Sequence, residues 1–83
     1  MSLTTHDLRI LHLASQDAEG RLGFHITPDG SIALRIFGTG VTLPAEDSLP
    51  RLEGQGLLMR CTGRTFVLTP EGWEAVKALG LAG

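Results

Sequence analysis

The chain has 83 residues, the size of one small domain, so we treat residues 1–83 as a single unit. Seven basic and nine acidic residues give a net charge of −2, which argues against a general nucleic-acid binder because such proteins carry clustered basic residues. Cys61 is the only cysteine, so the chain can form neither an internal disulfide nor a thiolate metal cage. No signal peptide or membrane-length apolar run is recognisable, so we expect a cytoplasmic protein without membrane contact.

The first predicted element is a helix that begins after Thr4. Thr4 is a suitable N-cap, and Asp7 follows three residues later, as in an acidic version of the capping box. Leu3 and Leu8 are spaced as in a hydrophobic staple. The pattern predicts a helix that continues to about Gln16.

Residues 22–43 allow two interpretations. Leu22 to Ile26 is a short strand candidate, and Thr27-Pro28-Asp29-Gly30 follows it. As a turn, this tetrapeptide closes a hairpin with Ile32 to Phe37. As a helix start, Thr27 caps and Pro28 takes the first position, so that Ile32, Ala33, Ile36 and Phe37 form one stripe. We prefer the helix, although β-branched residues favour strands.

A second helix is expected between Pro44 and Gly54. Pro50 would interrupt it unless the helix starts near Asp47 or Ser48, with Ser48 as the cap. Glu46 and Asp47 make this segment acidic.

A hairpin and a third helix complete the chain. Leu57 to Cys61 and Arg64 to Thr69 are two short runs rich in apolar and β-branched residues, separated by Thr62-Gly63. If Cys61 pairs with Arg64, then Met59 and Phe66 face the core together. Thr69-Pro70-Glu71 then predicts a helix start.

The stretch LPRLEGQGLLMRCTGRTFVLTPEGW, residues 49–73, resembles the winged-helix family of helix-turn-helix domains. The matching residues are Arg51-Leu52-Glu53, Gln55-Gly56-Leu57-Leu58, Gly63-Arg64 and Leu68 to Gly72. The resemblance implies an α+β winged helix-turn-helix of three to four helices with a C-terminal β-hairpin wing. The alternative is an α-β-β-α-β-β-α order, with residues 22–43 as a second hairpin.

The resemblance also implies a small DNA-binding transcription regulator that acts as a homodimer on double-stranded DNA. The expected DNA contacts are Thr42, Ser48, Arg51, Arg60 and Arg64. The acidic second helix is unfavourable for phosphate contact, and it favours the alternative of a protein–protein interaction or dimerisation module without DNA binding. A basic strip joining Arg35, Arg51, Arg60 and Arg64 would favour DNA, and scattered arginines would favour protein contact.

No enzyme chemistry is recognisable in the sequence. Gly38-Thr39-Gly40 lacks the third glycine and the lysine of a phosphate loop. His6 and His12 are six residues apart, so they do not share a helix face as metal ligands would. We therefore expect no catalytic residues, no metal and no cofactor.

Overall fold

The computed structural model describes residues 3–37, 40, 42–45 and 47–80. Three helices and five strands follow one another in a mixed order along this part of the chain. They are α1 (Thr5–Ala14), β1 (Arg21–Ile26), β2 (Ile32–Ile36), β3 (Thr42–Pro44), α2 (Ser48–Gly54), β4 (Leu58–Cys61), β5 (Thr65–Leu68) and α3 (Pro70–Ala78).

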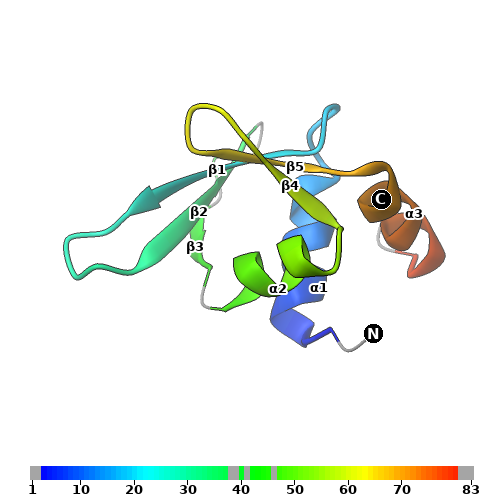
Figure 1. The fold of residues 1–83 in the computed structure, drawn as a ribbon, viewed down its shortest axis with the longest axis horizontal. Coiled ribbons are helices and arrows are strands. Elements are labelled where there is room, and N and C mark those ends of the chain that lie inside the picture. Colours follow the sequence, from blue (N-terminus) through cyan, green and yellow to red (C-terminus); the bar gives the residue numbers. More distant parts are fainter. Residues whose placement is uncertain (1–2, 38–39, 41, 46, 81–83) are drawn as a thin grey trace.

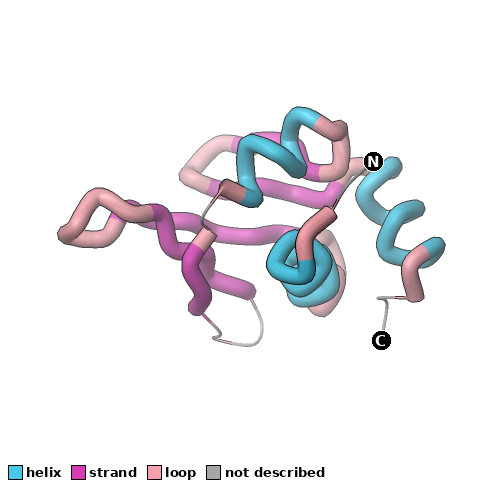
Figure 2. Tube along the Cα trace, turned by 90° about the horizontal axis from the view of Figure 1, so that it is seen from below, coloured by secondary structure: helices cyan, strands magenta, loops and turns pink. Residues whose placement is uncertain are grey.

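The strands form one antiparallel sheet in the order β3-β2-β1-β5-β4. α1 and α2 lie below this sheet in Figure 1, and α3 stands beyond the end of β5. The view from below shows α1 and α2 in front of the strands (Figure 2). No described helix covers the opposite face, so the molecule has two layers.

Side chains that alternate along the strands divide between the two faces of the sheet. Leu22, Leu34 and Ile36 are fully buried on the inner face, where the helices pack. Phe66 lies beside Leu22 in the register and is buried with them. The helix residues that complete this core are Ile10, Leu11, Ala14, Leu49, Leu52 and Val76.

The predicted first helix is confirmed. Thr4 Oγ1 accepts from Asp7 N, and Asp7 Oδ2 accepts from Thr4 N, each at 3.0 Å, so both halves of the capping box are present. The helix ends at Ala14, two residues earlier than expected.

The preferred helix over residues 27–37 is wrong. β2 occupies this segment and pairs with β1 from Leu22↔Ile36 to Ile26↔Ile32. Gly30 has φ 89°, a conformation that suits a turn and not the first turn of a helix. The β-branched residues of β2 thus decide the structure, as strand preference suggested. The hairpin alternative describes residues 22–37 correctly, but it lacks the third strand, β3.

The winged helix-turn-helix prediction is wrong for the same reason. The fold needs a helix where the structure has β2, and the sheet has five strands and not a small wing. The second helix exists only as Ser48–Gly54, because Pro44 closes β3 and Pro50 then falls in the first turn.

The β4–β5 hairpin forms with a register that differs by one residue from the prediction. Cys61 pairs with Thr65, and Arg60 pairs with Phe66. The loop has three residues because Gly63 and Arg64 both adopt positive φ, 71° and 55°. This shift turns Met59 outward and Arg60 inward.

The third helix is confirmed, with Thr69 Oγ1 accepting from Gly72 N at 2.9 Å. Gly72 brings α3 against the start of β4, because a Cβ there would lie 2.2 Å from Leu57 O. None of the helices in the described part of the chain is long and apolar enough to cross a membrane.

Candidate functional site

Two of the predicted DNA-contact residues, Ser48 and Arg51, bind a buried carboxylate. Asp7 is fully buried, and its Oδ1 accepts from Ser48 Oγ at 2.5 Å and from Arg51 Nη2 at 2.8 Å. Arg51 Nε donates to Asp7 Oδ2 at 2.7 Å. The Arg51 guanidinium holds the pKa of Asp7 well below its usual range, opposed by burial of the carboxyl and assisted by Ser48 and Thr4. These contacts join α1 to α2.

The other three predicted contact residues are spread over the sheet. Thr42 is exposed on the edge strand β3, and Arg60 lies on β4, the opposite edge. Four strand spacings of about 4.8 Å separate these edges, or about 19 Å. Arg64 occupies the β4–β5 turn. A DNA contact by any of the five residues stays a prediction.

The arginines do not form the basic strip that would favour DNA. Arg35 pairs with Gly23 and Thr42, and it alternates with the buried Leu34 and Ile36, so it belongs to the outer face. Arg60 belongs to the inner face, with its guanidinium carbon 5.4 Å from the Phe66 ring centroid. Arg60 Nη2 also lies 3.9 Å from Glu53 Oε1. The positive charges are therefore divided between the two faces.

The most unusual surface feature is the end of the β1–β2 hairpin, residues 26–32, which we call the arm. β5 pairs with β1 only at Arg21, Leu22 and Gly23, so the arm extends past its neighbour and projects from the molecule in Figures 1 and 2. Ile26 and Ile32 face each other across the arm. They are 59% and 37% exposed, although they lie on the inner face of the sheet.

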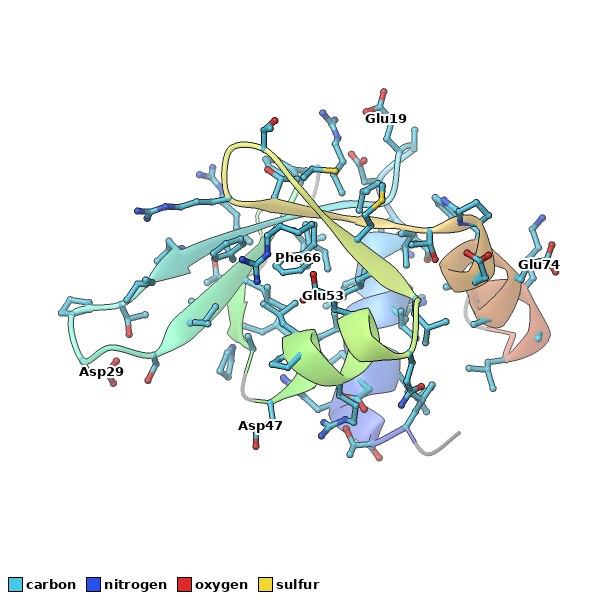
Figure 3. All side chains as sticks on the ribbon, viewed as in Figure 1. Glu19, Asp29, Asp47, Glu53, Phe66 and Glu74 are labelled. Atoms are coloured by element: carbon cyan, nitrogen blue, oxygen red, sulfur yellow. The ribbon has the colours of Figure 1, made fainter. Side chains whose placement is uncertain are left out.

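The tip of the arm is held by a dense set of hydrogen bonds. Thr27 N donates to Ser31 O at 2.8 Å, and Gly30 N donates to Thr27 O at 2.9 Å. Asp29 Oδ1 accepts from Ser31 N at 3.0 Å and from the Thr27 hydroxyl. The Thr27 hydroxyl is the main cause that lowers the pKa of Asp29. The arm is thus an ordered hairpin with an ionised carboxylate at its end, as labelled in Figure 3.

A groove lies between the base of the arm and α2. Its volume is about 240 Å³, and its lining is apolar except for one acidic and one basic side chain at the rim. The lining residues are Phe24, Ile32, Leu49, Pro50, Glu53, Arg60 and Phe66. Figure 3 shows Phe66 and Glu53 between β4 and α2, where they bound this groove.

Ile32 also lines two further hollows. One, of about 570 Å³, lies along the arm and β3, and the other, of about 340 Å³, lies between Gly30 and Asp47. An apolar side chain that borders three hollows on a projecting hairpin is a natural contact point for another molecule.

The sequence did not identify this surface. Ile26 and Ile32 have the same alternation as the buried Leu22, Leu34 and Ile36, so their pattern indicates core. The one available signal was that Ile26 lies close to the Pro-Asp-Gly turn, which places it at the end of a hairpin. The sequence does not show that β5 stops short of this end, and that is what leaves Ile26 exposed.

Among residues 3–37, 40, 42–45 and 47–80, no group of His, Cys, Asp and Glu side chains could hold a metal ion. No family model, curated protein or solved structure matches the chain. The function must therefore be inferred from the surface itself.

Proposed function

We propose that this domain is a protein–protein interaction module that binds through the arm and the groove. The observation that carries the proposal is the exposed Ile26–Ile32 pair, which borders an apolar groove on a projecting hairpin. Full burial of an isoleucine side chain contributes about 1.5–3 kcal/mol. A partner that covers both isoleucines would gain only part of this energy, because Ile26 is 59% and Ile32 37% exposed. The cytoplasm remains the expected location.

A selection from a peptide library displayed on phage tests this function. We expect wild-type protein to enrich peptides with apolar anchors, because the groove accepts such side chains. Ile26→Glu should abolish enrichment, since it places a charge against the apolar contact. Met59→Glu is the matched control, because Met59 is also exposed but lies on the outer face at the β4 edge. Enrichment that is equal for wild type and Ile26→Glu would contradict the proposal.

DNA binding is a second candidate, favoured by one observation. Within the described part of the chain, neither Arg35 nor Arg64 forms an ion pair with a carboxylate. Both side chains are exposed. Arg35 lies on β2, and Arg64 lies beside the neighbouring strand β1, where Phe24 N donates to Arg64 O at 3.0 Å. Two such exposed cations could contact phosphates.

Fluorescence anisotropy with a random-sequence DNA duplex tests this candidate. If binding uses two phosphate contacts, the logarithm of the binding constant should fall with the logarithm of the salt concentration with a slope of about −2. The double substitution Arg35→Ala with Arg64→Ala should remove the salt-dependent binding. A wild-type protein that leaves the anisotropy unchanged at low salt would exclude it.

A further inference from the structure

We propose that the partner seated on the arm and groove is a second copy of this chain, related by a two-fold axis that passes beside the arm. The inference rests on the proposed interaction function and names its partner. One projection and one groove lie next to each other on the same surface, and their placement points to this partner.

A two-fold interface requires a patch that is complementary to itself. Here Ile26 is the projection, and the groove lined by Leu49, Pro50 and Phe66 is the recess. Ile32 belongs to both, because it pairs with Ile26 and also lines the groove. A two-fold rotation about an axis near Ile32 therefore exchanges the two features, and each copy's Ile26 enters the other's groove.

The same rotation determines where the tip of the arm lies. The partner's arm runs antiparallel to the first, so its tip points back across the groove toward Arg60 and Glu53. Asp29 is the carboxylate at that tip, and Arg60 at the groove rim is largely exposed. Arg60 can leave its 3.9 Å contact with Glu53 and pair with the partner's arm tip. The interface thus places two opposite-charge pairs at the ends of an apolar centre, which matches the usual anatomy of interfaces.

A net charge of −2 adds little repulsion between the two copies. A second copy carries both a projection that fits the recess and a recess that fits the projection. The self-complementary arrangement satisfies both at once.

Sedimentation equilibrium of the full chain tests the inference over a concentration series that reaches about 1 mM. We expect a reversible monomer–dimer equilibrium. Ile26→Glu enters the interface twice and should raise the dissociation constant at least about a hundredfold. Met59→Glu should leave it unchanged, because Met59 lies on the outer face of the sheet and does not line the groove.

Charge reversal separates a specific contact from a folding defect. Asp29→Arg and Arg60→Asp should each weaken the dimer, and the double variant should restore it, since the pair is re-formed with opposite signs. A damaged turn at Asp29 would not be rescued by a change at Arg60. Circular dichroism confirms that each variant is folded.

Three results would overturn the inference: a monomer at every concentration, a dimer that Ile26→Glu does not weaken, or an Arg60→Asp variant that dimerises as tightly as the wild type. If the wild type is a monomer but still selects apolar peptides through Ile26, the interaction function stands and the partner is a different protein. If the peptide selection fails as well, the interaction function itself is wrong.

Discussion

The buried Asp7 provides the sharpest test of how this small domain is held together. Asp7→Asn preserves the size of the side chain but removes its charge. Asp7 accepts four hydrogen bonds, from Thr4 N, Ser48 Oγ, Arg51 Nε and Arg51 Nη2. The amide group has a single acceptor oxygen, so it must lose the bonds on one of its two sides.

The expected cost follows from these contacts. Hydrogen bonds to charged groups contribute about 1.5–3 kcal/mol each. The Arg51 side chain is 34% exposed and can recover some hydration, so its part is discounted. We expect Asp7→Asn to lower the free energy of unfolding by about 2–4 kcal/mol. In a domain of this size that corresponds to a Tm lower by roughly 8–30 °C.

Urea unfolding followed by circular dichroism measures this loss. Glu74→Gln is the matched control, because Glu74 is an exposed carboxylate on α3, and its change should stay within about 0.5 kcal/mol. A double-mutant cycle with Arg51→Met should show a coupling energy of about 1–3 kcal/mol. A loss below about 1 kcal/mol for Asp7→Asn would refute the argument that this carboxylate joins α1 to α2.

The lowered pKa of Asp7 adds a pH dependence with a definite sign. Because the folded state favours the ionised carboxyl, its contribution is fully present above the unfolded pKa, about 3.9, and is lost as the pH falls below it. The stability difference between wild type and Asp7→Asn should therefore shrink in acid. A difference that stays constant from neutral pH to well below about 3 would contradict this assignment.

Glycine substitutions test the packing and the turns by urea unfolding. Gly72→Ala should lower the free energy of unfolding by about 2–3 kcal/mol, because its Cβ would lie 2.2 Å from Leu57 O. This loss outweighs the better helix propensity of alanine. An unchanged stability would mean that α3 is not packed at this point. Gly30→Ala should cost about 1–2 kcal/mol through strain alone, since φ is 89° and nothing lies within 4 Å of the new Cβ. Gly54→Ala has equally open surroundings without a positive φ and should stabilise by about 0.5 kcal/mol; equal effects at both positions would refute the strain argument.

Local signals in the sequence predicted the ends of elements better than the fold. Thr4 with Asp7, and Thr69 with Pro70, located two helix starts because capping depends on residues within one turn. Thr27-Pro28-Asp29-Gly30 resembles Thr69-Pro70-Glu71-Gly72, yet one is a turn and the other a helix start. The difference comes from the next segment of the chain, since Ile32 to Ile36 find partner strands on both sides.

The candidate site was harder to predict because exposure depends on neighbours distant in the sequence. The resemblance predicts DNA contacts for Ser48 and Arg51, but both side chains bind Asp7, more than forty positions earlier in the chain. A one-residue change in loop length, at Arg64, exchanged the faces of Met59 and Arg60. Neither effect produces a periodic pattern in the sequence from which it could be predicted.

The strand order has a consequence for how the chain matures. β1 comes first in the sequence but lies third in the sheet, between β2 and β5. During synthesis β1 can pair early with β2, whereas its other edge waits until residues 65–67 emerge. Until then this edge of β1 is unpaired, and association through it would compete with correct completion of the sheet.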